Sequence, residues 1–299
     1  MKFPSRFIHS VKIRLIPQGI IAITASMLIA SVEADPPSTP VAESVVQNID
    51  SLVDAAHTAY SHQRYRETVA LLRERLRAPR LSEERRAQLW MLVGHAGLRS
   101  SDPELVDEAI TAFGKASEFS ETWKNPALYY QGNAKVLLNR PDEALAIYEA
   151  LLERKLPAAF RLRTKMARGV ALFLMAQTDP AHLVPASEMF GAVANDEAAG
   201  LSMRLEAFCR KTKIHVAAEQ WRAAMESAKQ AKELCLAHNQ QGVLWAQRAL
   251  HEVALSEAAR EQWQSAVDLL EEAAQLAGPM TADCERQAEA WRLRHFLWE

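Results

Sequence analysis

The sequence predicts an all-α protein of about six antiparallel helix pairs followed by one C-terminal helix. Composition supports helices, because 49% of the 299 residues are apolar and only 10 are glycine. Runs of β-branched residues bounded by Gly and Pro, which would indicate strands, are missing from the chain. A recurring pattern of small and apolar residues indicates that one helix-pair unit is repeated.

The unit is clearest at residues 125–157, which end on a proline. Gly132 and Ala144 lie twelve residues apart, and Tyr148 and Leu151 follow them. Small side chains at the first two positions allow two antiparallel helices to approach closely, and the larger side chains fill the space beside them. One pair cannot bury both of its apolar faces alone, so successive pairs are expected to stack.

Five further segments share this pattern, and in two of them an Asp-Pro motif lies in a connecting loop that we expect to be longer than the others. These motifs are Asp102-Pro103 in the second unit and Asp179-Pro180 in the fourth. The residues that mark the five segments are Ala56 and Leu72; Gly94, Gly97, Ala109 and Phe113; Gly169, Ala186 and Phe190; Ala224 and Ala228; and Ala254, Ala266 and Leu270.

This arrangement resembles the tetratricopeptide repeat family over about residues 45 to 280. The family motif has 34 residues, with a Trp/Leu-Gly-Tyr pattern on the first helix, an Ala-Phe-Ala pattern on the second and a terminal Pro. The first and fifth units depart from it, with Thr68 in place of Ala and Thr212 in place of Gly. The resemblance implies a right-handed superhelical solenoid at residues 43–280, and residues 281–299 are expected to form a capping helix.

The resemblance also implies a concave groove, lined by the first helices, that receives protein or peptide segments. Asn133 stands where the family often has a peptide-binding asparagine, whose amide can donate and accept hydrogen bonds. Met and aromatic side chains beside Arg or Lys suit a peptide with apolar anchors and a negative group. For Met166 and Phe173 the alternative is a place in the core. The residues expected in the groove are Met91, His95, Tyr129, Asn133, Arg163, Met166, Phe173, Cys209 and Lys213.

Residues 1–34 are expected to be a signal peptide that is not part of the fold. Residues 20–30 form an uncharged, mostly apolar run, and Val32-Glu33-Ala34 resembles a peptidase site, with cleavage expected after Ala34. The run is shorter than the roughly 20 residues that span a bilayer. The alternative is an uncleaved anchor that would attach the protein to a membrane. Residues 35–42 are expected to form a flexible, proline-rich linker. The leader's basic residues are Lys2, Arg6, Lys12 and Arg14.

The net charge argues against nucleic acid as a partner. The whole chain carries −2 and residues 1–34 carry +3, so the chain after cleavage carries −2 − 3 = −5. Proteins that bind nucleic acids usually show a basic footprint instead. The segment Arg64–Arg86 holds eight Arg and four Glu, which we interpret as a solvated surface with pairs at i,i+4. The alternative is a basic patch for an acidic partner or lipid head groups.

Motifs that would indicate an enzyme are missing from the sequence. It contains no H-E-x-x-H, no G-x-S-x-G and no phosphate-binding glycine loop, so no catalytic residue, cofactor or metal is expected. The cysteines are Cys209, Cys235 and Cys284, an odd number for an oxidising compartment. We expect them to be small buried side chains, with a Cys209–Cys235 disulfide as the alternative.

The leading hypothesis is an exported scaffold, periplasmic or secreted, that binds protein segments and organises a cell-envelope assembly. Two alternatives stay open. One is a membrane-anchored module whose leader is retained, and the other is a binder of cell-wall carbohydrate. The only hint of the second is a set of four tryptophans, most of them at repeat-core spacing: Trp90, Trp221, Trp245 and Trp263.

Overall fold

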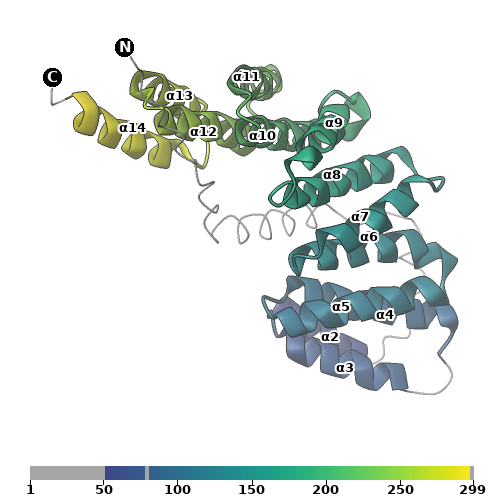
Figure 1. The fold of residues 1–299 in the computed structure, drawn as a ribbon. Helices are drawn as coiled ribbons and strands as arrows, with labels where there is room; N and C mark the ends of the chain where they lie inside the picture. Colours follow the sequence, from purple (N-terminus) through teal and green to yellow (C-terminus); the bar gives the residue numbers. More distant parts are fainter. Residues whose placement is uncertain (1–50, 78–80, 297–299) are drawn as a thin grey trace, which may run out of the picture.

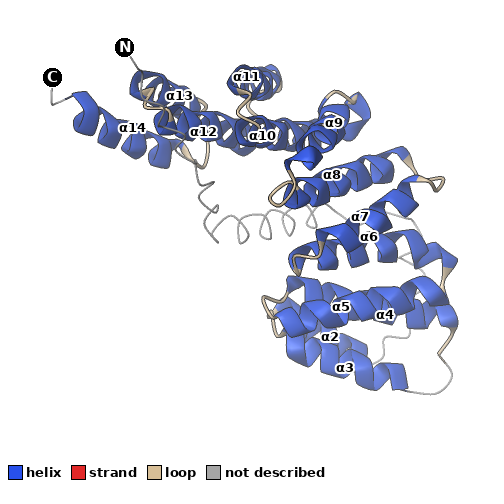
Figure 2. Cartoon of the chain, viewed as in Figure 1, coloured by secondary structure: helices blue, strands red, loops and turns tan. Residues whose placement is uncertain are grey.

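The computed structural model describes residues 51–77 and 81–296. The predicted signal peptide at 1–34 and linker at 35–42 lie outside the described residues. Within the described ranges every regular element is helical, and no strand occurs there (Figure 2). The prediction of an all-α fold is therefore confirmed.

Thirteen α-helices in the described ranges pack in the order of the sequence, which confirms six pairs and a further helix. The pairs are α2 (Ser51–Ser61) with α3 (Tyr65–Arg77), α4 (Glu83–Arg99) with α5 (Pro103–Phe119), α6 (Glu121–Leu137) with α7 (Pro141–Leu152), α8 (Ala158–Met175) with α9 (Leu183–Ala194), α10 (Leu201–Ala217) with α11 (Trp221–Ala237), and α12 (Val243–Ala259) with α13 (Trp263–Gln275). The last helix, α14 (Thr281–Phe296), packs on α13.

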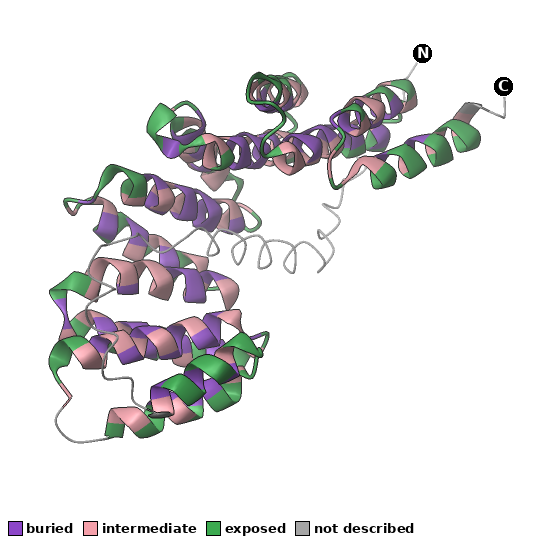
Figure 3. Ribbon diagram, turned by 180° about the vertical axis from the view of Figure 1, so that it is seen from behind, coloured by how far each residue is buried: buried purple, intermediate pink, exposed green. Residues whose placement is uncertain are grey.

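The pairs stack because each second helix also packs on the first helix of the next pair. First helices of successive pairs touch as well, as α4 with α6, α6 with α8 and α10 with α12. The stack bends near α9 and α10, so that α2–α8 form one arm and α10–α14 the other (Figure 1). Buried residues lie on the helix faces that meet within and between pairs (Figure 3). The core is thus a band along the stack, as expected for a solenoid.

Three pairs are held together by a glycine on the first helix that leaves room for an aromatic ring on the second. A Cβ atom added to Gly132 would lie 2.5 Å from Cε1 of Tyr148. The same construction at Gly94 meets the Phe113 ring at 2.5 Å. In the fourth pair, Gly169 would meet the Phe190 ring at 2.9 Å. Any side chain larger than hydrogen would therefore push the two helices apart or displace the ring.

The other three pairs use different side chains at the equivalent positions, which lie 16 residues apart as Gly132 and Tyr148 do. Compared with the Gly–aromatic pairs, the first helix here carries a larger side chain and the second a smaller one. The combined volume of the two facing side chains is therefore limited in the same way. Thr212, the departure from the repeat pattern in the fifth unit, thus faces the position where Ala replaces an aromatic residue. The combinations, all buried, are Ala56 with Leu72, Thr212 with Ala228, and Ala254 with Leu270.

Four of the six pairs share one type of turn between their helices. A non-glycine residue with positive φ follows the first helix, and the next backbone N–H donates to a carbonyl five residues back, at 2.8–2.9 Å. This is the hydrogen-bond pattern of a Schellman motif, which ends a helix within a short turn. The positive-φ residues occupy the same position of the repeat: Gln63, Asn139, Glu219 and Glu261.

The second and fourth pairs have Asp-Pro at this junction, and the expectation of a longer loop is wrong for the second pair and confirmed for the fourth. Only residues 100–102 separate α4 from α5, because Asp102 caps α5 by accepting a hydrogen bond from the Glu104 N–H at 3.0 Å and Pro103 is the first helical residue. Residues 176–182 separate α8 from α9. Within this longer connection Asp179 accepts from the Ala181 N–H at 3.0 Å and begins a 3₁₀ turn that runs directly into α9.

The three cysteines are buried and free, so the alternative of a Cys209–Cys235 disulfide is not realised. Burial raises the pKa of the Cys209 thiol to about 11. It also raises the pKa of Cys235 and of Cys284. All three therefore serve as small buried side chains, as the sequence indicated.

The Gly–ring contact predicts strong coupling between Gly169 and Phe190. Gly169→Ala is expected to lower the free energy of unfolding by about 1–3 kcal/mol, although helix propensity alone favours Ala by up to about 1 kcal/mol. Phe190→Leu removes the atoms that the new methyl group would meet. The double variant, which has the Ala/Leu combination of the first and sixth pairs, is therefore expected to cost less than the two single changes added together. Urea unfolding of the four proteins measures this.

Gly191→Ala is the matched control, since a Cβ there would meet only Lys211 Cε, at 4.0 Å. It is expected to leave stability unchanged or slightly raised. Additive costs in the double variant, or a Gly169→Ala protein as stable as the wild type, would contradict the proposed contact.

Candidate functional site

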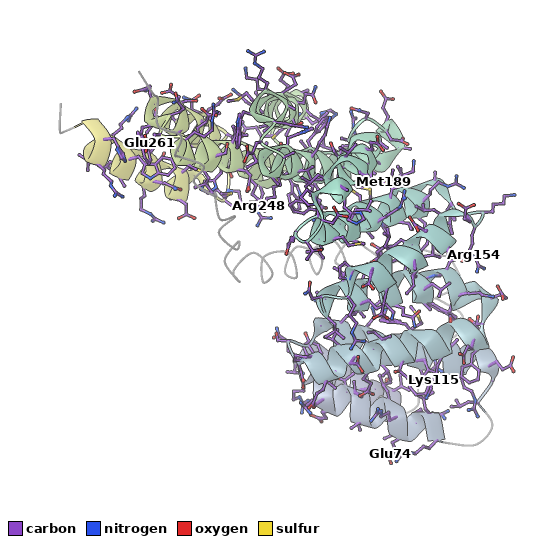
Figure 4. The ribbon with its side chains drawn as sticks, viewed as in Figure 1. Glu74, Lys115, Arg154, Met189, Arg248 and Glu261 are labelled. Carbon is purple, nitrogen blue, oxygen red and sulfur yellow. The ribbon has the colours of Figure 1, made fainter. Side chains whose placement is uncertain are left out.

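The first helices of the pairs lie next to one another within each arm of the stack, and we call the side that they form the inner face. Arg248 of α12 lies on it, on the side of the bend that faces the other arm (Figure 4). Side chains bridge from one first helix to the next along most of the chain. The bridges are His95 with Tyr130 (ring centroids 4.4 Å), Tyr129 with Phe160 (5.5 Å), Lys213 with Glu252 (3.4 Å) and His251 with Gln287 (2.9 Å).

The part of the inner face between α2 and α8 carries a compact group of rings and guanidinium groups. Tyr129 and Tyr130 are adjacent in α6, with ring centroids 5.3 Å apart. The Tyr130 ring stacks on Phe113 at 5.6 Å, and the His95 ring lies edge-on to both. We call this group the aromatic–arginine cluster; its members are Tyr60, His95, Arg99, Tyr129, Tyr130, Phe160 and Arg163.

The tyrosines of the cluster are held in their neutral, hydrogen-bond-donating form. Burial raises the pKa of Tyr129 to about 12. It also raises the pKa of Tyr130, against the opposing charge of Arg163. For Tyr60 burial again raises the pKa, and the charge and hydrogen bond of the Arg99 side chain oppose it. The cluster therefore places neutral phenols beside two positive charges, and none of its members is acidic.

Arg163 is half-buried and forms no ion pair within the described part of the chain. Its charge acts on both Tyr129 and Tyr130. The nearby acid, Glu206, is buried and accepts two hydrogen bonds from the Arg210 guanidinium, at 2.8 and 2.6 Å. Glu206 is thus neutralised by its own neighbour, and Arg163 keeps its hydrogen-bonding capacity for another partner.

A cavity of about 200 Å³ lies at the end of the cluster, between α2, α3 and α4. Tyr60 and His95 belong to both the cavity and the cluster, so the two are continuous. The pKa of His95 is lowered to about 4, first by burial and then by the charge of Arg99. The imidazole that forms part of the wall is therefore neutral at pH 7. The other lining residues are Ala56, His57, Thr68, Leu72 and Leu92.

Four residues expected to face the groove are instead in the core. Asn133 is 1% exposed, and its amide oxygen accepts a hydrogen bond from the Tyr148 hydroxyl at 2.7 Å. Its position on the first helix points toward the second helix of the same pair, so the amide oxygen is used inside the fold, whereas the buried Nδ2 has no hydrogen-bond partner among the described residues. Met91, Met166 and Cys209 are buried as well, and for Met166 the core alternative is the one that the structure supports.

The remaining five expected residues are half-buried, and three of them come together. His95, Tyr129 and Arg163 all belong to the aromatic–arginine cluster. Phe173 packs against the core from the edge of α8, whereas Lys213 pairs with Glu252 in the other arm. Whether any of these residues binds a partner stays a prediction.

The sequence reasoning missed four members of the cluster: Tyr60, Arg99, Tyr130 and Phe160. A signal was present for Arg99, which lies four residues after His95 and so on the same helix face. Tyr60 lies four residues after Ala56, which marks the core of the first unit, so this spacing indicated the core and not the groove. Tyr130 and Phe160 carry no such signal, because their place depends on how α6 and α8 approach one another.

The tryptophans named for carbohydrate binding are each packed against a cation or another ring. Lys115 Nζ lies 4.2 Å from the Trp90 ring centroid, and the His295 ring stacks on Trp263 at 3.6 Å. Arg260 and Arg248 cover Trp221 and Trp245, at 4.9 and 5.1 Å. Nothing in this packing favours the carbohydrate alternative.

The arginine-rich segment is paired with acids of its own and of the following helices, as expected for a solvated surface. Arg64 pairs with Glu67 at 2.9 Å. Arg73 pairs with Glu108 at 2.7 Å, and Arg66 pairs with the capping residue Asp102. These pairs are largely exposed and contribute little to stability.

Among the described residues, no group of three or more His, Cys, Asp and Glu side chains is arranged to hold a metal ion. No helix at 51–77 or 81–296 is long and apolar enough to span a bilayer.

Comparison with known proteins gave one kind of similarity. No protein-family model matches the chain, and no curated protein matches it. Among solved structures, the chain is similar to the crystal structure of the TPR domain of P58(IPK), with 14% identity and a TM-score of 0.34, over 93% of this chain and 76% of that one. The fold assignment therefore rests on the packing of this chain's own helices.

The lowered pKa of His95 predicts that stability depends on pH. In the folded protein this pKa is about 4, whereas an unfolded histidine titrates near 6.5. As pH falls from 7 to 5, the unfolded chain takes up a proton that the folded chain does not, so the free energy of unfolding decreases. His95→Gln removes this contribution. The decrease between pH 7 and pH 5 should be about 1–2 kcal/mol smaller in the variant, measured by urea unfolding.

His62→Gln provides the control, because His62 is an exposed histidine at the end of α2. That variant should keep the full pH dependence of the wild type. An equal pH dependence in wild type and His95→Gln would show that the imidazole is not held neutral by burial.

Proposed function

We propose that this protein is an exported, non-catalytic scaffold whose inner face binds segments of other proteins and organises a cell-envelope assembly. The similarity to a tetratricopeptide repeat domain is consistent with a protein-binding scaffold, and the envelope role is the part that we add. Export is supported by the basic leader, the apolar run and the peptidase-like site before Asp35.

The observation that carries the proposal is the run of ring contacts that joins α4, α6 and α8 on the inner face. Each repeat of a solenoid contacts only the neighbouring repeats, so the stack as a whole presents a long surface that an extended chain can follow. Along α2, α4, α6 and α8 this surface holds half-buried rings, a cavity and a guanidinium group that pairs with no acid in the described part of the chain. Aromatic residues and arginine are the side chains that contribute most energy at protein interfaces.

Site-specific photo-cross-linking in the native host tests the inner face as the binding surface. A photoreactive amino acid at His57 or Arg248, near the two ends of the inner face, is expected to capture a discrete protein partner. Lys229 and Glu188 are the controls, since they are exposed on second helices. Partners captured only from the control positions would show that binding occurs elsewhere.

The N-terminal sequence of the protein purified from its host tests export. Cleavage after Ala34 predicts a mature chain that begins Asp35-Pro36-Pro37. A membrane-bound protein that retains Met1 would instead support the anchored alternative, in which the inner face keeps the same role.

A further inference from the structure

Resting on this proposed function, we infer that the inner face between α2 and α8 binds an acidic protein segment that carries one large apolar side chain. In this arrangement the apolar side chain enters the cavity beside Tyr60 and His95, and a carboxylate of the same segment is bound by Arg163. The inference names the chemistry of the partner, which the proposed function leaves open.

The cavity has the size and lining for one apolar side chain. Its volume of about 200 Å³ is below the roughly 300–1,000 Å³ typical of sites for whole small molecules. Leu72, Leu92 and the Ala56 methyl group supply apolar walls. The His95 ring contributes a neutral surface that is also half-buried. Burying one leucine or phenylalanine side chain there would strengthen binding about 10- to 100-fold.

The charges along the cluster select an acidic segment over a basic one. Arg163 is a half-buried guanidinium that forms no ion pair within residues 51–77 and 81–296, so a bound carboxylate would gain charge-assisted hydrogen bonds. Arg99 lies beside the cavity, and its charge reaches His95 and Tyr60. The buried acid on this side, Glu206, is held by Arg210 and does not compete for Arg163.

The distance between the two subsites sets the spacing of the segment. The cavity lies at α2–α4, and Arg163 lies on α8, with α6 between them. Packed helices are about 8–10 Å apart, and two to two and a half such spacings place the subsites about 16–25 Å apart. An extended chain covers about 3.3 Å per residue, which places the acidic residue about five to eight positions from the apolar one.

Selection from a random library of 16-residue peptides, displayed on phage and presented to the full chain, tests the inference without knowledge of the natural partner. We expect enrichment of peptides with Asp or Glu about five to eight positions from Leu, Met or Phe. Arg163→Glu is expected to weaken these peptides at least tenfold. Arg161→Glu, an exposed position on the same helix, makes the same charge change outside the cluster and should alter their affinity less than twofold.

Leu92→Phe narrows the cavity without changing charge and is expected to weaken the same peptides at least fivefold. Thermal unfolding identifies any variant that has lost its fold. If the enriched peptides bind Arg163→Glu and Leu92→Phe as tightly as the wild type but lose affinity for Arg248→Glu, this inference is overturned and the inner face remains a binding surface. If their affinity is the same for all three variants as for the wild type, the inference is overturned and the proposed function is contradicted as well.

Discussion

The close approach of the two helices in each pair is the contact on which the rest of the structure depends. Gly94, Gly132 and Gly169 leave space that the ring of the second helix fills. The other pairs reach the same fit with Ala against Leu or Thr against Ala. What recurs from pair to pair is therefore a limit on the combined volume of the two facing side chains, and no single residue type is needed at either position. Because a pair packed in this way still exposes apolar faces, the pairs must stack, and stacking produces the inner face.

The inner face differs from both the core and the solvated surface. The core positions of the first helices are filled by Met91, Asn133, Met166 and Cys209, whereas the positions next to them carry rings and charges that are only half-buried. Half-buried rings, and a guanidinium that forms no ion pair with the described residues, can still be reached by a ligand. This accessibility is the physical reason to regard the aromatic–arginine cluster as a binding surface.

The helix pairs could be predicted because a 34-residue repeat leaves a periodic pattern of small and large residues. The prediction is wrong at the entry to α5, because proline is well suited to the first helical position and Pro103 therefore belongs to the helix and not to a loop. The site was predicted less well. Side chains of neighbouring helix residues point about 100° apart, so a shift of one position moves a residue from the groove to the core. Asn133 belongs to the core, where its amide oxygen accepts a hydrogen bond from Tyr148. The meeting of Tyr130 with Arg163 depends on the packing of α6 against α8, which the sequence does not encode locally.

The most direct test of this account is amide hydrogen exchange on a variant of one pair, Gly94→Leu, compared with the wild type. If the pairs are held only by their neighbours, protection should be lost in α4 and α5 and reduced in α3 and α6. Protection in α12, α13 and α14 should stay unchanged. An equal loss of protection from α2 to α14 would show one global cooperative unit and would contradict a stack built from locally packed pairs.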